Sequence, residues 1–353
     1  MLYVDAHQDL AYGALAFGRD YRRSVHETRT RESNTTIADI TGTCTLGFPE
    51  MRRAGIGLVF ATVFTLPAEH QKKGELAYHS IDGAHAHALA QLDIYNRWVD
   101  TDEHLHLVRS RSELARLITL RNDPNRGRRD IGLVLLMENA EPILDPDETD
   151  EWWKRGVRII GPAWARNRYT GSSREGESLQ SLGEALLDRM QRCGFVLDLT
   201  HMSDNAASVC LERYSGPLVV THANARRFVS GARMIADEVL QGVTAGGGIL
   251  GLMPANWALG KPDSAGQRRG EVSADSVADT ILRLRRYLGS GAVGLGSDWD
   301  GGFGREQLPG DFDSIGDIGA IAQALLKRGA SDEFVESFMG GNWRRFIEQV
   351  LPE

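Results

Sequence analysis

Residues 131–137, Ile-Gly-Leu-Val-Leu-Leu-Met, decide the fold, because no position carries a polar side chain and a carboxylate, Glu138, follows directly. A strand with one face in water alternates apolar and polar residues, whereas a parallel strand covered by helices on both faces reads as a continuous apolar run. The stretch therefore predicts a buried parallel strand. An ionised Glu138 at its end requires a cation or a proton, since an unpaired buried charge costs several kcal/mol.

The rest of the chain alternates similar apolar runs with amphipathic segments, which predicts strands that alternate with helices and pair in parallel. Further strands are expected at residues 2–4, 55–66, 105–108, 157–164, 195–201, 217–222, 248–253 and 292–298, of which 105–108 is the weakest. Helices are expected at residues 75–99, 180–192, 203–214, 236–241, 273–288, 314–328 and 332–350. Ser110 and Glu113 have the spacing of a capping box. About eight strands, with no glycine-rich phosphate loop after the first, favour a closed (β/α)8 barrel over an open nucleotide-binding sheet.

We expect one barrel domain over residues 1–353. It carries a surface insertion near residues 19–50, whose Arg-rich part at 19–38 is expected to be a long polar loop. The helices at 314–350 close the chain.

Composition narrows the class of protein. The chain has 353 residues, of which 42% are hydrophobic and 25% charged, as in soluble globular proteins. A net charge of −8 argues against nucleic-acid and anionic-membrane partners, which require basic surfaces. We also expect no signal peptide and no membrane span. The three cysteines are scattered singly, which fits a reducing, cytoplasmic location.

Six polar residues fall at the carboxyl ends of the predicted strands. In a (β/α)8 barrel these ends converge on one face, where active sites are built. The other seven histidines are expected in helices or loops, so the grouping is selective. The six residues are His7, Asp9, Glu138, His201, His222 and Asp298.

This donor set suits two metal ions. His7 and Asp9 lie two residues apart, so on a strand they face the same side and can hold one ion. His201 and His222 would hold a second ion, and Glu138 would bridge both. Imidazole and carboxylate ligands without thiolates favour zinc, with manganese, iron or cobalt as alternatives. Two such ions can share a hydroxide nucleophile, with Asp298 as general base, which is hydrolytic chemistry.

Other roles stay open for single members of this set. His201 and His222 taken alone could be core histidines bonded to backbone carbonyls, and Asp298 could cap a helix. Asp198 and Asp300 are read as supporting or capping groups.

Seven motifs in order through the chain resemble the membrane dipeptidase (renal dipeptidase) family of metallopeptidases. They are VDAHQDL at 4–10, FATVFT at 60–65, MEN at 137–139, LDLTHMS at 197–203, VVTHANAR at 219–226, GARMIADE at 231–238 and GLGSDWDG at 294–301. The resemblance implies an amidohydrolase-type (β/α)8 barrel, often dimeric, with a two-zinc site that hydrolyses dipeptides. The motifs match the family's metal ligands at His7, Asp9, Glu138, His201 and His222. They match its catalytic acid/base at Asp298 and its substrate-carboxylate arginine at Arg233.

The chain departs from the family on the substrate side and resembles a divergent, bacterial-like member. Members of the family carry a histidine at the end of the strand that follows the bridging glutamate, and Trp164 takes that place here. The Gly-Gly-His that usually follows the glutamate is replaced by Asn139-Ala140-Glu141. An indole donates one hydrogen bond and cannot become cationic. Nearby side chains that could compensate are Arg166, Arg168 and Tyr169, whose alternative role is as solvated loop residues.

Three functions therefore compete. The first is a zinc dipeptidase acting on a small-molecule substrate, without a membrane anchor. The second is hydrolysis of another small amide, such as an N-acyl amino acid or a lactam, because Trp164 reshapes the pocket. The third is a metal-binding protein that has lost catalysis.

Overall fold

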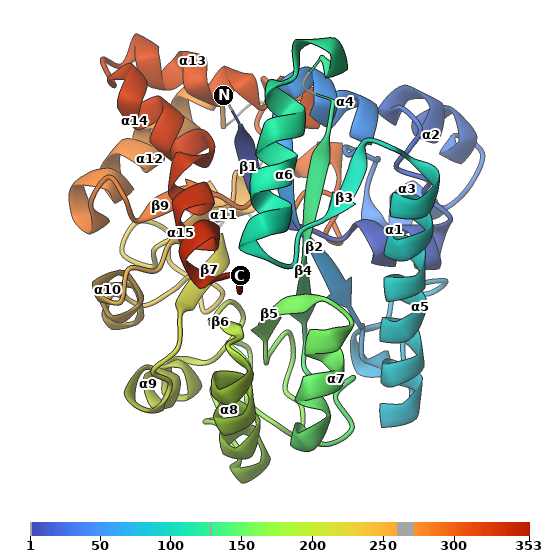
Figure 1. Cartoon of the computed structure of the whole chain (residues 1–353), viewed down its shortest axis with the longest axis vertical. Coiled ribbons are helices and arrows are strands. Elements are labelled where there is room, and N and C mark those ends of the chain that lie inside the picture. Colours follow the sequence, from blue (N-terminus) through green and yellow to red (C-terminus); the bar gives the residue numbers. More distant parts are fainter. Residues whose placement is uncertain (1, 128, 260–271) are drawn as a thin grey trace.

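A computed structural model describes residues 2–127, 129–259 and 272–353, and in these ranges the strands form one sheet in which every pairing is parallel. Figure 1 shows the strands surrounded by a ring of helices, which is the arrangement of a (β/α)8 barrel and confirms the predicted fold. The strands are β1 (Tyr3–Gln8), β2 (Ile56–Phe64), β3 (Leu105–Leu107), β4 (Ile131–Glu138), β5 (Val157–Gly161), β6 (Val196–Asp198), β7 (Leu218–Ala223), β8 (Leu250–Leu252) and β9 (Val293–Leu295).

Eight of these strands lie in the order β1-β2-β4-β5-β6-β7-β8-β9, and β3 pairs with β4 outside this path. β3 and β5 share one edge of β4. Leu105 of β3 lies beside Ile131 at the start of β4, whereas Gly161 of β5 lies beside Glu138 at its end. The weakest of the predicted strands is thus a short accessory strand.

The barrel closes where β9 meets β1. The backbone N–H of Asp298 donates to the carbonyl of His7 at 3.2 Å. The buried Asp5 carboxylate accepts from the backbone N–H of Ser297 at 2.7 Å and from its hydroxyl at 2.6 Å, and Gln8 donates to it at 2.8 Å. A carboxylate inside the protein therefore joins the first and last strands through neutral donors.

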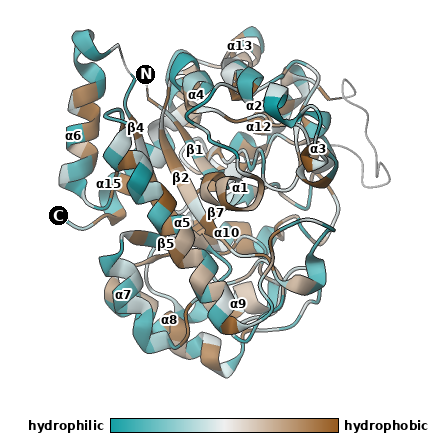
Figure 2. Cartoon of the chain, turned by 90° about the vertical axis from the view of Figure 1, so that its right-hand side faces the viewer, coloured by the Kyte–Doolittle hydropathy of each residue, from teal (hydrophilic) through white to brown (hydrophobic). Residues whose placement is uncertain are grey.

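Helices cover the outside of the barrel, with apolar faces toward the strands and hydrophilic faces toward solvent (Figure 2). None of the described helices is long and apolar enough to cross a bilayer. The helices are α1 (Leu10–Phe17), α2 (Val25–Glu32), α3 (Ile37–Thr41), α4 (Phe48–Ala54), α5 (Ile81–Thr101), α6 (Arg111–Asn122), α7 (Thr149–Lys154), α8 (Ser181–Cys193), α9 (Asp204–Arg213), α10 (Asp237–Ala245), α11 (Asn256–Leu259), α12 (Ala274–Leu288), α13 (Gly319–Lys327), α14 (Asp332–Glu336) and α15 (Asn342–Val350).

α6 and α15 close the end of the barrel at which the strands begin. Trp343 of α15 is fully buried, packs edge-on against Phe60 at 5.1 Å and donates from its indole to the carbonyl of Leu295 at 3.0 Å. A π-helical turn over Ser337–Gly341 joins α14 to α15, so the single helix expected at 332–350 is interrupted. Gly340 sits in this turn because a Cβ there would overlap the carbonyl oxygen of Leu2.

The prediction of a long polar loop at 19–38 is wrong. Ser24 and Glu27 form a reciprocal capping box that starts α2, and α3 follows. The buried positions of α2 are Val25, Thr28 and Glu32, so its inner face is largely polar and gives no hydrophobic periodicity.

Two local expectations are also corrected. Ser110 caps α6 by accepting from the backbone of Glu113, but the Glu113 side chain binds Arg109 instead of completing a capping box. The strand expected at 157–164 ends at Gly161, so Trp164 lies in the loop beyond it.

Replacing Asp5 with alanine would leave the buried Ser297 donors without an acceptor. We expect the free energy of unfolding to fall by about 2–4 kcal/mol, because each unsatisfied buried donor costs about 1–3 kcal/mol. Urea denaturation measures the change, and Asp93→Asn on the exposed face of α5 is the matched control. A loss for Asp5→Ala no larger than for the control would contradict the role of this carboxylate in closing the barrel.

Candidate metal centre

The structure brings together all six residues that the sequence placed at strand ends. His7 lies in β1, Glu138 ends β4 and His222 lies in β7, while Asp9, His201 and Asp298 follow β1, β6 and β9 within a few residues. None of the six is more than 9% exposed. The residues come from five strands and converge because parallel strands place their carboxyl ends at one rim.

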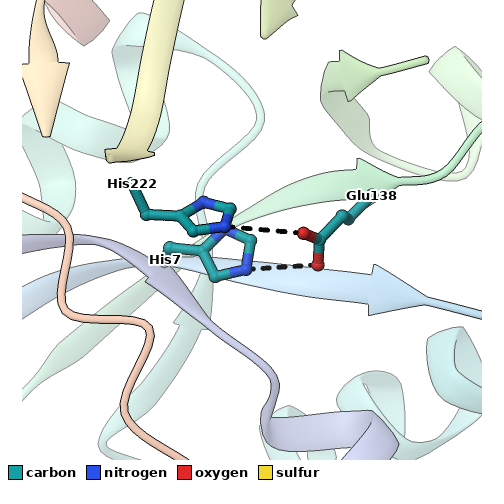
Figure 3. A group of neighbouring side chains, drawn as sticks. All are labelled: His7, Glu138 and His222. Atoms are coloured by element: carbon teal, nitrogen blue, oxygen red, sulfur yellow. Dashed lines mark ion pairs between the residues drawn. The ribbon is translucent and has the colours of Figure 1, made fainter. Parts of the chain in front are cut away.

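The Glu138 carboxylate is the centre of the group, and Figure 3 shows it facing the imidazoles of His7 and His222. Its Oε2 lies 3.2 Å from Nε2 of His7. Its Oε1 lies 2.9 Å from Nε2 of His201 and 3.6 Å from Nε2 of His222. One oxygen of this carboxylate therefore faces His7 and the other faces His201 and His222, and the ring centres of His7 and His222 lie 3.6 Å apart.

Asp9 and Asp298 approach the same ring nitrogen of His7 as Glu138 does. Nε2 of His7 lies 3.7 Å from Oδ1 of Asp9 and 3.8 Å from Oδ1 of Asp298. Asp9 is oriented by the hydroxyl of Thr62, which donates to Oδ1. Three carboxylates thus crowd one buried imidazole.

This crowding shifts the pKa values of the buried groups in opposite directions. Burial and the charge of Glu138 raise the pKa of Asp9 to about 7, and burial raises the pKa of Asp298 well above its usual range. Burial favours a neutral His7, but Glu138 and the two aspartates outweigh it and raise the His7 pKa to about 10. Burial also lowers the pKa of His201 to about 3 and holds that of His222 well below normal.

These features fit a divalent cation. Neither ring nitrogen of His7 has a well-aligned hydrogen-bond partner within the described part of the chain, although both are buried. Nε2 of His201 and Nε2 of His222 approach to 3.0 Å, with their rings held neutral, the form in which imidazole binds metals. Two sets of ligand atoms lie within 4.8 Å of one another: His7, Glu138 and His222; and His7, Asp9 and Asp298. Imidazole and carboxylate donors without thiolate suit zinc or a similar ion.

Two further buried aspartates support the centre from behind. Asp198 accepts from Thr200 and from the backbone of Thr221 at 3.0 Å, and the Thr221 hydroxyl lies 3.0 Å from Nδ1 of His222. Asp198 thus orients His222 through a hydroxyl, as metal-binding histidines usually require.

Asp300 ties the loop of Asp298 to the insertion. It accepts from the backbone N–H and the hydroxyl of Thr45, each at 2.7 Å, and lies 3.3 Å from the buried guanidinium of Arg19. The insertion near 19–50 therefore reaches the centre from the side.

Backbone strain is concentrated at the same rim. Among the described non-glycine residues, a left-handed backbone occurs at four positions, all at strand ends around the site: Asn139, His201, Asp298 and Asp300. Asparagine tolerates this conformation better than most residues. That tolerance suits asparagine to the position directly after Glu138.

A cavity of about 500 Å3 opens onto the centre. Arg233 lines it, and its Nη2 donates to the carbonyl of His222 at 3.0 Å, while its buried Nη1 has no partner in the described ranges. Trp164 also lines the cavity, with its ring centre 6.2 Å from that of His201. Both residues expected on the substrate side thus lie in the cavity wall.

The three residues considered as substitutes for the missing family histidine do not line this cavity. Arg166 pairs with Glu177 on the surface, and Arg168 donates to the carbonyl of Leu144 at 2.9 Å. The buried Tyr169 hydroxyl donates to the carbonyl of Ile143. Arg168 and Tyr169 are therefore structural, not solvated.

His70 and Arg174 are among the cavity residues that the sequence missed. His70 was grouped with the histidines outside the site, and nothing in its local pattern separates it from them. One member of that group is also corrected, because His106 lies in β3, where it pairs with Asp130 at 2.8 Å.

The fold and the donor set at its rim are those of metal-dependent hydrolases built on a (β/α)8 barrel. The chain matches the family described as membrane dipeptidase (Peptidase family M19) over residues 1–351, and it belongs to this family. The match confirms the resemblance seen in the motifs.

Relatives agree with this membership. The chain is 29% identical over 204 residues to a dipeptidase, tcpJ, of Claviceps purpurea, covering 55% of this chain and 45% of the relative. It is 28% identical over 172 residues to dipeptidase 3 of Rattus norvegicus, covering 49% of this chain and 33% of the relative. These matches span less than half the length of either relative.

Solved structures share the fold over the whole chain. An M19 dipeptidase aligns with a TM-score of 0.78 and 22% identity, covering 100% of this chain and 99% of its own. A Rhodobacter sphaeroides metallopeptidase, crystallised with a phosphinate mimic of the dipeptide L-Ala-D-Ala, aligns with a TM-score of 0.77 and 22% identity, covering 99% of both chains.

Zinc should stabilise the folded chain, because it relieves the repulsion among the buried carboxylates. At a zinc concentration of about 100 times Kd we expect a gain of about 2.7 kcal/mol, which raises Tm by about 3–4 °C relative to chelator-treated protein. Differential scanning calorimetry measures the shift, and elemental analysis gives the stoichiometry. Glu138→Gln should reduce both the Tm shift and the amount of zinc bound. An equal Tm shift in this variant would contradict the role of Glu138 as a metal ligand.

Proposed function

We propose that the chain is a dipeptidase that hydrolyses the amide bond of a dipeptide with the help of two divalent ions, zinc being the best fit. The observation that carries the proposal is the position of Glu138, with one oxygen toward His7 and the other toward His201 and His222. This arrangement suits a carboxylate that bridges two ions.

In this proposal His7 and Asp9 would hold one ion, His201 and His222 would hold the other, and Glu138 would contribute to both. When bound, such a pair of ions supplies an activated water and polarises the amide carbonyl. Asp198, behind the centre, keeps the imidazole of His222 in place through the hydroxyl of Thr221.

Asp298 is the acid/base. Its carboxylate points into the cavity beside His7, and its burial keeps its pKa far above that of an exposed aspartate. A carboxylate in this state takes a proton from the attacking water and returns it to the leaving amine nitrogen. The left-handed backbone at Asp298, fixed by its hydrogen bond to His7, holds the carboxylate in position.

Arg233 binds the substrate's terminal carboxylate. Its unpartnered Nη1 and its place in the cavity wall make it a ready donor for an anion. The dipeptide mimic bound by the Rhodobacter sphaeroides relative supports a substrate of this size.

A second candidate is the hydrolysis of another small amide, such as an N-acyl amino acid or a lactam. It is favoured by Trp164, which replaces a polar histidine with a large aromatic wall beside His201. Dimerisation and a cytoplasmic location stay predictions of the sequence.

Asp298→Asn should reduce kcat by about 100-fold or more, because general acid–base catalysis contributes about 10²–10⁴-fold. The variant should retain both ions by elemental analysis, since Asp298 is not among the five proposed ligands. Asp93→Asn is the control for a carboxylate-to-amide change. Unreduced turnover would exclude Asp298 as the acid/base.

A substrate panel separates the candidates. L,L- and L,D-dipeptides, N-acetyl amino acids and a β-lactam are assayed with added zinc, and we expect the dipeptides to have the highest kcat/KM. Arg233→Met should raise KM for dipeptides by about tenfold or more, because a charge-assisted bond to the terminal carboxylate is lost. Preference for the acyl amino acids or the lactam would favour the second candidate. No hydrolysis by the zinc-loaded protein would indicate a silent homologue.

A further inference from the structure

The cavity contains a second arginine that the proposed mechanism does not use. Arg174 lines the same wall as Arg233. Within the described ranges, the polar contacts of both guanidinium groups are to ring nitrogens and a backbone carbonyl, and none is to a carboxylate. Two arginines, neither in an ion pair with a carboxylate of the described residues, therefore face one cavity.

The contacts that position the Arg174 side chain are to uncharged rings, so they do not neutralise its positive charge. Its guanidinium lies over the Trp164 ring, 4.5 Å from the ring centre, and its Nη1 lies 3.2 Å from Nδ1 of His70. Trp164 is in turn packed edge-on against Phe64 at 5.3 Å. Stacking on an aromatic face orients a guanidinium and leaves its other N–H groups available to an anion.

The backbone next to Arg174 is hydrogen-bonded to the segment that carries His201. The N–H of Ser173 donates to the carbonyl of His201 at 2.7 Å, and Ser172 forms a bridge with Met202. Arg174 therefore has a defined position relative to a proposed metal ligand, although its side chain reaches the open part of the cavity.

Arg174 and Arg233 lie on the same side of the cavity. Ser173 and Ala232, their chain neighbours, both line this cavity and also an adjoining one. A ligand held by Arg233 thus extends next to Arg174.

Apart from the proposed metal and catalytic carboxylates, the charged side chains of the cavity lining are Arg174, Arg233, Lys72 and Glu75. Lys72 lines the cavity and donates to the carbonyl of Ile40 at 2.6 Å. Glu75 is the acidic residue in the lining apart from the proposed metal and catalytic carboxylates, and it accepts from the backbone of Lys72 at 3.1 Å. Three cations and one anion favour a substrate with more than one carboxylate.

We propose that Arg174 is a specificity-determining residue that binds a second carboxylate, so that the enzyme prefers dipeptides whose C-terminal residue is aspartate or glutamate. Arg233 binds the main-chain carboxylate of that residue and Arg174 binds the one on its side chain. We assign the second carboxylate to the C-terminal residue because Arg174 lies on the same side of the cavity as Arg233, which binds the main-chain carboxylate of that residue. This inference rests on the proposed dipeptidase function.

Isosteric substrate pairs test the proposal. Ala-Glu is compared with Ala-Gln, and Ala-Asp with Ala-Asn, each with an L- and a D-configured C-terminal residue. For at least one configuration we expect kcat/KM to favour the acid by about tenfold or more, because a site built for a polar group discriminates against the analogue that lacks it. Arg174→Met should reduce this ratio to near one, mainly through KM, and Arg174→Lys should give an intermediate ratio. Arg166→Met, an exposed arginine on the same loop but outside the cavity, should keep it.

Binding provides a readout that does not depend on turnover. In the Asp298→Asn enzyme, calorimetry should give a Kd for Ala-Glu about tenfold lower than for Ala-Gln, and Arg174→Met in that background should remove the difference. Dipeptide hydrolysis without an acid preference, or a preference that survives in Arg174→Met, overturns the inference but leaves the dipeptidase assignment intact. No dipeptide hydrolysis at all overturns both.

Discussion

The buried carboxylate of Glu138 is the constraint on which the arrangement of the strand ends depends. Imidazoles from β1, β7 and the turn after β6 face its two oxygens, with Asp9 and Asp298 close by. So many titratable groups are stable inside a protein only when charge and hydrogen bonds are balanced. The barrel brings the groups together, because closing the sheet brings β1 next to β9 and places five strand ends around one point, and a bound cation would complete the charge balance.

The barrel holds this centre with carboxylates that never enter the cavity. Asp5 joins β1 to the residues after β9, Asp198 joins β6 to β7, and Asp300 joins the loop after β9 to Thr45. Each accepts hydrogen bonds from backbone and hydroxyl groups of a neighbouring segment. The insertion takes part through Arg19, so a region that looks peripheral in the sequence contributes to the geometry of the site.

Sequence patterns were most informative where local chemistry and fold agree. The run ending at Glu138 is apolar throughout because β4 is covered on both faces, and it was recognisable for that reason. α2 was missed because its buried face includes Thr28 and Glu32, which form no apolar stripe. Asn139 and Trp164 were visible as departures from the family, but their surroundings were not, since these depend on loops distant in sequence.

The sequence alone determined the parallel barrel and the identity of the donor groups at its rim, because strand-end position is a local property that a parallel barrel converts into proximity. Trp164 and Arg233 were expected in the cavity wall, but only the tertiary structure added His70 and Arg174 to it. These four residues come from three loops, after β2, β5 and β7, and their contacts arise from how these loops fold over the rim. No periodicity specifies such contacts. The donor groups at the rim could therefore be predicted from the sequence, whereas most of the cavity wall could not.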